Sequence, residues 1–406
     1  MQNPTNGARP AAGPLAGLKV VEFGHVIAGP MAGTLMADLG ADVVHVEDPG
    51  RGDPARTMGP DKDGVFLWWK VSGRNKRSVT LNLREDRGQQ IAHDLVRWSD
   101  VMITNMRVET LEKWQLDWAH VRHIRPRLVM LQVTGYGADS TLRNSPGFGK
   151  VGEARSGVVH VTGFADGPPV HTGFSHADTV TGLMGAFAVQ AALYRRATDP
   201  NFQGEWIDLA LFESLYRLIE WQVIVYDQLG TVPQRSGNQL AVAPAVVVNT
   251  YLSRDDDWIT VTTGTPRSVQ NVARLVGVPQ SDVDSVPKQV QQRDRLDQAL
   301  REWVGARATD DCLSEMEKLD VVASRIFSVE DILADATYRE REDVISVDDA
   351  ELGPVRMQAV VPKMHCNPGA VWRTGPQLGE DNDKVYGDYL GFSAADIAAM
   401  RDAQVI

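Results

Sequence analysis

An acidic residue stands at the start of a long uncharged segment, and a carboxylate in that position has two roles open to it. Asp178 is followed by residues 179–194, which contain no charged side chain, and then by Arg195 and Arg196. A segment that is apolar on all sides is typical of a buried helix, so we expect Asp178 to be its N-cap. A carboxylate on a rigid buried element beside a cleft can also attack an acyl carbonyl as a nucleophile. The residues alone leave both roles open.

Imidazole side chains could assist this chemistry. His171 and His176 precede Asp178 closely in the sequence, and an imidazole near a carboxylate changes the charge of both groups. Either imidazole could therefore tune the charge of a nucleophile at Asp178.

The remaining histidines and the cysteines do not form a metal site. His120 and His123 are three residues apart, but no cysteine or third histidine completes a ligand set. Cys312 and Cys366 are distant from each other in the sequence, so neither a disulfide nor a thiolate metal site is expected. This cysteine usage is consistent with a reducing cytoplasm.

The elements that must position these residues alternate between strand and helix in the first 135 residues. We expect strands over residues 18–24, 43–47, 79–83, 101–105 and 128–134. We expect helices between them, over residues 31–39, 86–98 and 108–124. This alternation predicts an α/β fold with a parallel sheet, in which ligands bind at the carboxyl ends of the strands.

The loops that follow these strands carry the candidate binding residues. They are residues 25–30, 48–53, 105–107 and 135–137, the last of which opens a long Gly/Ser/Pro-rich loop to residue 157. Gly24, Gly29 and Gly33 lack the G-x-G-x-x-G spacing of a dinucleotide site, although Glu47 lies at the distance where such a site has its ribose ligand. An NAD-dependent oxidoreductase is therefore only weakly indicated.

The rest of the chain predicts a second domain and a return to the first. A strand near residues 206–211 and a helix over 213–228 are followed by a loop-rich boundary at 230–245. A hairpin (246–252 and 258–263) and three helices come next, then strands at 344–347 and 355–361 and an exposed helix from Ser393. We expect a flexible lead-in over 1–17, a large α/β domain over 18–229, a small α+β domain over 230–325, and a return to the large domain over 326–406.

The bulk composition excludes several classes of protein. The formal net charge is −12 and the sequence pI is about 5.3, which disfavours nucleic-acid binding. The N-terminus has no apolar core of a signal peptide, and no apolar run reaches the length of a membrane span. We expect a cytoplasmic protein.

Several motifs together resemble the class III CoA-transferases, the family of formyl-CoA transferase and carnitine CoA-transferase. They are residues 15–30, 37–49, 52–53, 75–83, 100–105, 135–137, the Asp178 helix and 378–380. The resemblance covers nearly the whole chain. It implies a large Rossmann-like domain formed by both chain ends and an interlocked homodimer.

The resemblance also implies a mechanism, with Asp178 at the place of the family's catalytic aspartate. This carboxylate would attack an acyl-CoA, form a mixed anhydride and then an aspartyl-CoA thioester, and pass CoA to a second carboxylic acid. CoA is then a substrate, and no metal or separate cofactor is implied. The CoA contacts of the family fall on Ile27, Ala28, Leu81, Asn82, Leu83, Arg84, Asn105, Met106, Arg107, Lys113, Thr134, Gly135, Tyr136 and Gly137.

The chain departs from the family pattern at three places. Asp48 stands where some members have a basic residue for CoA. Residues 237–243 contain one glycine, where formyl-CoA transferases have a glycine run that closes over oxalate. Phe148 stands where an α-methylacyl-CoA racemase, the runner-up of the same fold, has its histidine base.

The acyl substrates are less clear from the residues. Residues 147–157 are closest in style to members that handle succinyl-CoA and other dicarboxylic acids, and Arg155 or Arg143 could hold a distal carboxylate. A non-catalytic CoA-binding protein remains an alternative that Asp178 disfavours.

Overall fold

The computed structural model describes residues 13–406, so the prediction for residues 1–12 lies outside the described part of the chain. The chain divides into two compact units. Unit 1 contains the residues up to Val158 together with Thr172–Glu220 and Arg339–Ile406. Unit 2 contains Val159–His171 and Trp221–Tyr338. Both ends of the described chain therefore belong to the same unit.

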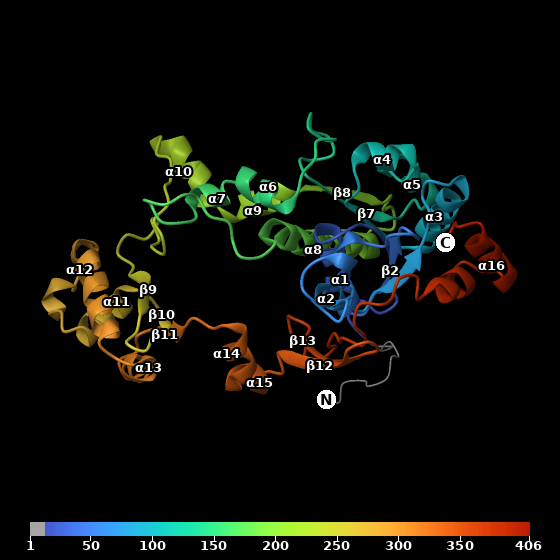
Figure 1. Cartoon of the computed structure of the whole chain (residues 1–406). Coiled ribbons are helices and arrows are strands. Elements are labelled where there is room, and N and C mark those ends of the chain that lie inside the picture. The colour runs from blue at the N-terminus through green and yellow to red at the C-terminus, as the bar shows by residue number, and fades with distance from the viewer. Residues whose placement is uncertain (1–12) are drawn as a thin grey trace. The chain divides into compact units, whose positions relative to one another are not determined.

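Unit 1 is built on a six-stranded sheet in which every pairing is parallel (Figure 1). The strands lie in the order β5 (Arg77–Thr80), β2 (Asp42–Glu47), β1 (Lys19–Phe23), β6 (Val101–Thr104), β7 (Val129–Thr134) and β8 (Glu205–Ala210). The predicted α/β fold with a parallel sheet is confirmed. The strand order reverses between β1 and β6, which is where open parallel sheets bind ligands.

Alternate residues of these strands enter two separate cores, because successive side chains of a strand point to opposite faces. Val20, Val43 and Val101 pack with residues of α1 (Ala28–Asp38) and α8 (His176–Thr198). Their neighbours Val21 and Val44 pack with residues of α3 (Asp86–Trp98), α4 (Val108–Lys113), α5 (Trp118–Ile124) and α16 (Ala394–Asp402). Helices therefore cover both faces of the sheet, as a buried parallel sheet requires.

The other elements of unit 1 are short. They are η1 (Pro54–Thr57), β3 (Asp61–Lys62), β4 (Val65–Phe66), α2 (Leu67–Ser72), α6 (Gly149–Arg155), α9 (Leu211–Leu218), β12 (Val344–Asp349), β13 (Gly353–Gln358) and the π-helix η3 (Lys384–Tyr389). Two predicted helices are each interrupted: residues 108–124 form α4 and α5, and residues 213–228 form parts of α9 and α10 (Trp221–Leu229). Gln115, with a φ of 54°, lies in the break between α4 and α5.

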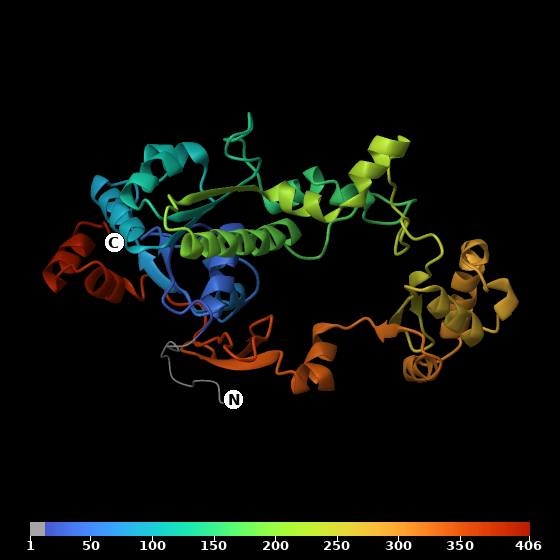
Figure 2. The ribbon, with the colours of Figure 1, turned by 180° about the vertical axis from the view of Figure 1, so that it is seen from behind.

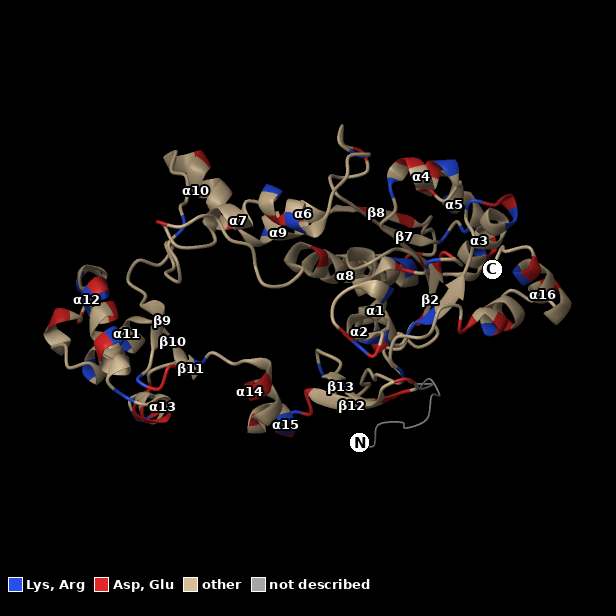
Figure 3. Cartoon of the chain, in the orientation of Figure 1, with Lys and Arg blue, Asp and Glu red and all other residues tan. Residues whose placement is uncertain are grey.

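The long helix α8 differs from its prediction at its start and on its surface. It begins at His176, and its N-cap is Ser175, so the prediction that Asp178 is the N-cap is wrong. Asp178 instead lies in the first turn, where a carboxylate still faces the positive end of the helix dipole. Figure 2 shows α8 as the long green helix, and Figure 3 shows its body without charged residues. It is not buried on all sides, because Leu183, Phe187 and Tyr194 are exposed.

The C-terminal segment packs against the sheet without adding a strand to it. Tyr386 of η3 is fully buried and donates its hydroxyl to the carbonyl of Thr80 at the end of β5. The amide of Asn82 donates to the carbonyl of Val405, the residue before Ile406. Strands β12 and β13 form a separate antiparallel pair. The C-terminal segment thus supports the edge of the sheet at β5.

Unit 2 has a small antiparallel sheet covered by helices. Its strands lie in the order β11 (Ala323–Arg325), β10 (Trp258–Thr262) and β9 (Val248–Leu252), and the predicted hairpin is β9–β10. Its helices are α10, α11 (Pro266–Leu275), η2 (Gln280–Asp282), α12 (Val286–Gly305), α13 (Thr309–Lys318) and α14 (Val329–Ala334). Two short helices, α7 (Val158–Val161) and α15 (Ala336–Glu340), lie where the chain passes between the units. Within residues 13–406, none of the helices has the length and apolar character that a bilayer crossing needs.

Candidate functional site

The carboxylate of Asp178 lies against the first residue of helix α6. A Cβ atom added at Gly149 would stand 2.0 Å from Oδ2 of Asp178, so only glycine leaves room for the carboxylate there. Gly149 is itself buried. The helices α6 and α8 thus bring residues 29 positions apart in the sequence into direct contact, and the predicted nucleophile is fixed between them.

The environment of Asp178 makes its carboxylate harder to ionise. Burial, followed by the negative charge of Glu153, raises the pKa of Asp178 to about 6, while Lys150 acts in the opposite direction. At neutral pH the carboxylate is therefore mainly ionised, and it is a stronger base than an ordinary aspartate. These are useful properties in a carboxylate nucleophile.

Glu153 and Lys150 are functional candidates that sequence reasoning missed. Glu153 is 1% exposed, and the two oxygens of its carboxylate lie 3.0 and 3.1 Å from Nζ of Lys150. The same ammonium donates to the carbonyls of Thr172 (2.9 Å) and Phe174 (3.0 Å), just before α8. Lys150 therefore ties α6 to the segment that leads into the helix of Asp178. One signal was available, since Gly149 and Glu153 are four residues apart and lie on one face of a helix.

The two neighbouring histidines are in different surroundings. His176 is the first residue of α8, its ring lies 5.2 Å from that of Phe174, and its Nδ1 is buried without a hydrogen-bond partner. His171 is exposed and belongs to unit 2. Phe148 is 77% exposed as the residue before α6, so an aromatic ring stands at the place where a racemase would need its base.

A second feature of unit 1 is a cavity of about 230 Å³ at the carboxyl ends of the strands. It is lined by His25, Val46, Glu47, Asp48, Arg51, Gly52, Pro54, Leu81, Leu83, Arg84, Met106 and Trp114. Four of the predicted CoA contacts are among these residues: Leu81, Leu83, Arg84 and Met106. The loops after β1, β2, β5 and β6 therefore meet as the parallel sheet predicts.

The other predicted contacts lie beside this cavity or on the next loop. Ile27 and Ala28 begin α1, Asn82 lies between two lining residues, and Arg107 and Lys113 are the exposed cations at the two ends of α4. Asn105 holds the first turn by donating to the carbonyl of His25 and accepting from its amide, both at 2.8 Å. Thr134 ends β7, and Gly135, Tyr136 and Gly137 follow it.

The loop after β7 connects the two features. Gly135 lies against Gly147, because a Cβ added at Gly135 would be 3.0 Å from the Cα of Gly147. The ring of Tyr136 lies 5.3 Å from the guanidinium of Arg155, which is also 5.4 Å from the ring of Phe212. The predicted CoA loop, residues 134–137, thus contacts Gly147 and Arg155, which lie before and after Gly149 and Glu153 in the sequence.

The charges around the cavity are partly compensated. Asp48 forms an ion pair of 2.6 Å with Arg84, and this hydrogen bond lowers the pKa of Asp48. Arg84 is 69% exposed, so a phosphate could bind it in competition with Asp48. The departure noted at Asp48 therefore weakens one cation of the cavity without removing it.

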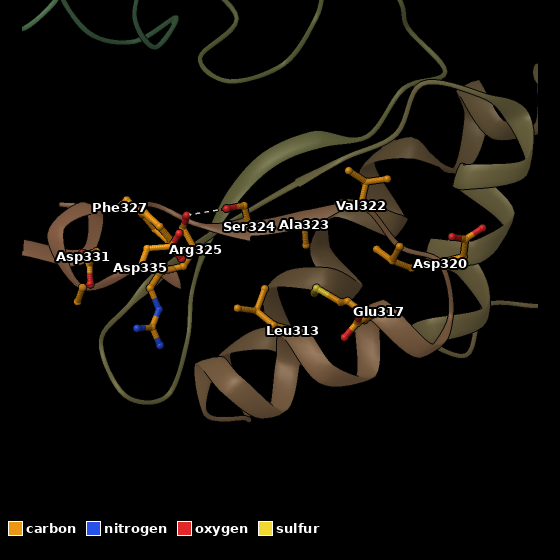
Figure 4. Close-up of a pocket in the computed structure, with 13 residues that line it drawn as sticks. Leu313, Glu317, Asp320, Val322, Ala323, Ser324, Arg325, Phe327, Asp331 and Asp335 are labelled. Carbon is orange, nitrogen blue, oxygen red and sulfur yellow. Dashed lines mark hydrogen bonds between the residues drawn. The ribbon is translucent and has the colours of Figure 1, made fainter. Parts of the chain in front are cut away.

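Unit 2 contains a larger groove of about 710 Å³, lined by residues 313–335 (Figure 4). None of the predicted site residues lines it. Four of its lining residues are acidic: Glu317, Asp320, Asp331 and Asp335. Its one cation, Arg325, already pairs with Asp257 and Asp310. Such a groove repels the phosphates of CoA, whereas the cavity of unit 1 contains four of the predicted contacts and is taken as the candidate site.

Within residues 13–406, no group of three or more acidic, histidine or cysteine side chains is arranged to hold a metal ion. His120 lies 2.5 Å from Asp117 on its own helix, at the exposed surface.

Known proteins resemble this chain over nearly its full length. The sequence profile of CoA-transferase family III matches residues 15–382. A succinyl-CoA–D-citramalate CoA-transferase of Chloroflexus aurantiacus is 35% identical over 399 residues, which cover 97% of this chain and 98% of that protein. A succinate–glutarate CoA-transferase of Agrobacterium fabrum is 30% identical over 391 residues, covering 92% and 94%.

A solved structure agrees with these relatives. The crystal structure of a CAIB/BAIF family protein from Brucella suis has a TM-score of 0.80 and 29% identity, and the match covers 93% of this chain and all of that one. The resemblance expected from the sequence motifs is therefore confirmed by the profile, the relatives and the fold. The chain belongs to CoA-transferase family III and is a CoA-transferase, with CoA as a substrate.

Proposed function

We propose that the chain moves CoA from succinyl-CoA or another dicarboxylyl-CoA to a carboxylic acid, with Asp178 as the nucleophile. The observation that carries this proposal is the position of Asp178, whose carboxylate lies against Gly149 with a pKa of about 6. It is mainly ionised at neutral pH and partly removed from water, as a carboxylate nucleophile must be.

The reaction starts when an oxygen of Asp178 attacks the thioester carbon. The new C–O bond forms, the C–S bond breaks, and CoA leaves as the thiolate with the bonding electrons. The thiolate then attacks the carboxyl carbon of Asp178 in the mixed anhydride, which releases the donor acid and gives an aspartyl-CoA thioester. The acceptor carboxylate reverses these two steps and takes the CoA. No water or oxidant enters the balance, and exclusion of water protects the anhydride.

We further propose that CoA binds along the cavity of about 230 Å³ and the neighbouring loops. Its lining residues and the beginning of α1 would contact the nucleotide portion, and Arg84, Arg107 and Lys113 would meet phosphates. The packing of Gly135 on Gly147 supports a path for the thioester arm from the cavity toward Asp178.

Dicarboxylic substrates are supported by the relatives and by Arg155. The two relatives described above act, by their names, on succinyl, citramalate and glutarate groups. Arg155 is held between Tyr136 and Phe212, which leaves its guanidinium available for a distal carboxylate. Arg143, the other sequence candidate, already pairs with Glu112 at 2.6 Å. We therefore favour Arg155 for this role.

The assembly is proposed to be an interlocked homodimer. Leu183, Phe187 and Tyr194 are 59%, 71% and 73% exposed and form one stripe along α8, since they are four and seven residues apart. A second copy of the chain would cover such a stripe. We propose the cytoplasm as the compartment, because Cys312 and Cys366 are both free thiols.

The test is an assay of several CoA esters against several carboxylic acids, with products identified by mass spectrometry. We expect transfer with dicarboxylyl-CoA donors and none with Asp178→Ala. Hydroxylamine added during turnover should leave a hydroxamate on the peptide that contains Asp178. Transfer by the Asp178→Ala protein at the wild-type rate, or deuterium uptake at the α-carbon of a chiral 2-methylacyl-CoA without an acceptor, would overturn the proposal.

A further inference from the structure

The turn between β1 and α1, beside the cavity of unit 1, contains a residue with a strained backbone. Val26 lies between β1 and α1 with a φ of 66°, a left-handed conformation that is a genuine outlier for a β-branched residue. His25 before it lines the cavity, and Ile27 and Ala28 after it are proposed CoA contacts. Strained backbone of this kind persists only where its surroundings hold it, and it is concentrated at functional sites.

Asp53 is the group that holds the strained residue. The amide of Val26 donates to both oxygens of the Asp53 carboxylate, at 3.0 and 3.1 Å. The same carboxylate accepts from the amide of Ala55 at 2.7 Å. Asn105 fixes the adjoining peptide groups of His25 from the other side. Asp53 and Asn105 therefore both hold the turn, and the Asp53 carboxylate is the group that binds the left-handed residue itself.

Asp53 is in turn the end of a buried chain of alternating charges. Its Oδ2 lies 3.2 Å from Nε2 of His45 as an ion pair in which Nε2 makes no hydrogen bond, and Nδ1 of His45 lies 2.5 Å from Oε1 of Glu22. Lys76 completes the chain with contacts of 2.9 and 3.1 Å to Glu22 and 2.7 Å to the carbonyl of Pro30 in α1. All four charged residues are at most 1% exposed.

The imidazole in this chain carries a positive charge. Burial alone would lower the pKa of His45, but the contacts with Asp53 and Glu22 raise it to about 9. Burial would likewise raise the pKa of Asp53, and the contact with His45 instead lowers it to about 2. Buried ion pairs of this kind contribute little net stability, and their best-attested use is to specify one geometry. Here the geometry that they specify is that of the turn beside the cavity.

We propose that His45 is a positioning residue for CoA binding: held by Glu22, it places the Asp53 carboxylate where that group fixes the left-handed turn at Val26. This inference rests on the proposed function, because the turn matters only if CoA binds beside it. His45 does not touch the ligand and does not enter the chemistry. Its effect reaches CoA through the backbone of residues 25–28.

A double-mutant cycle with Val26→Gly tests the inference, because glycine adopts the left-handed conformation without steric cost and does not need to be held there. The effect of His45→Gln on the Kd for CoA is measured by calorimetry, once with Val26 present and once in the Val26→Gly protein. In the protein with Val26, His45→Gln should raise the Kd for CoA by about tenfold, because the strain of the left-handed β-branched residue is no longer held. In the Val26→Gly protein the same change should raise the Kd by less than about threefold, because glycine is not strained there.

Steady-state kinetics and folding controls accompany the cycle. In the Val26 protein the KM for the acyl-CoA should follow the Kd, while kcat changes by less than about threefold, because the chemistry at Asp178 is untouched. His123→Gln, at an exposed histidine of α5, is the matched control and should change none of these values. If His45→Gln fails to fold, Asp53→Asn supplies the same comparison, since it keeps an oxygen for the Val26 amide.

The outcomes separate this inference from the proposed function. An equal rise in Kd with and without Val26→Gly, or no rise at all, would overturn the positioning role of His45. Failure of the wild-type protein to bind CoA would overturn the proposed function, and this inference with it. A lower melting temperature with an unchanged Kd for CoA would show that the ion chain serves only the fold, which also overturns the inference.

Discussion

Asp178 is a residue in which stability and reactivity oppose each other. The pKa of its carboxyl group rises from 3.8 to about 6 on folding, first because of burial and second because of Glu153. Ionisation of Asp178 therefore requires more free energy in the folded protein than in the unfolded chain, which lowers the free energy of unfolding at neutral pH. An ionised, poorly solvated carboxylate is what the proposed transfer mechanism requires, so this cost is expected if Asp178 is the nucleophile.

Asp178→Asn should abolish transfer and stabilise the fold near neutral pH. A rise of about two pH units in the pKa corresponds to at most about 3 kcal/mol of unfolding free energy. For a raised carboxyl pKa, this destabilisation is absent below about pH 4 and complete above about pH 6. The melting temperature of the variant should thus exceed that of the wild type at pH 7.5 and approach it at pH 4. A variant less stable than wild type at pH 7.5 would contradict this account.

Glu153→Gln should change how activity depends on pH. Removal of the neighbouring negative charge lowers the pKa of Asp178, so the acidic limb of the kcat/KM profile should move from near pH 6 to lower pH. Glutamine keeps an oxygen for Lys150, which limits the structural disturbance. Glu315→Gln, at an exposed residue of α13, is the control. A uniform loss of activity with an unmoved limb would assign Glu153 a purely structural role.

At the scale of elements, the site depends on the close approach of α6 and α8. Gly149→Ala should raise the helix propensity of α6 but place a Cβ atom 2.0 Å from Oδ2 of Asp178. We expect transfer activity to fall by at least about a hundredfold, because small misplacements of a reacting group have effects of that size. Val151→Ala, at an exposed position of the same helix, should leave activity unchanged. Normal turnover by the Gly149→Ala protein would show that the contact is not needed.

At the scale of the whole molecule, the exposed apolar stripe of α8 predicts assembly. Phe187→Glu places a charge at the central residue of that stripe, which is 71% exposed in the single chain. The variant should shift the protein from dimer to monomer at micromolar concentration. Light scattering coupled to size-exclusion chromatography measures the mass directly. Ala395→Glu on α16 is the control and should leave the mass unchanged. A monomeric wild-type protein would refute the homodimer.

The sequence by itself determined the parallel sheet, and its motifs pointed to the family and to Asp178 as the proposed nucleophile. Strands such as β1 and β7 are short segments rich in apolar and β-branched residues and are followed by glycine-containing turns, a local pattern that predicts buried parallel strands. The charge of Asp178 before an uncharged segment of sixteen residues marked it as a candidate, and the resemblance to the family gave it the proposed role of nucleophile. These features depend on residues that are close in the sequence, so local reasoning reaches them.

Only the tertiary structure decided where Asp178 stands in its helix and what surrounds it. The N-cap is Ser175, three residues before Asp178, and the segment that leads into the helix is held by Lys150, which donates to the carbonyls of Thr172 and Phe174. The buried ion pairs Lys76–Glu22–His45–Asp53 join β1 and β2 to the residues that directly precede β5 and η1. In the sequence, these four charged residues look like ordinary surface residues. A charged residue does not reveal its partner until the fold removes both from water, because burial is what makes the pairing obligatory.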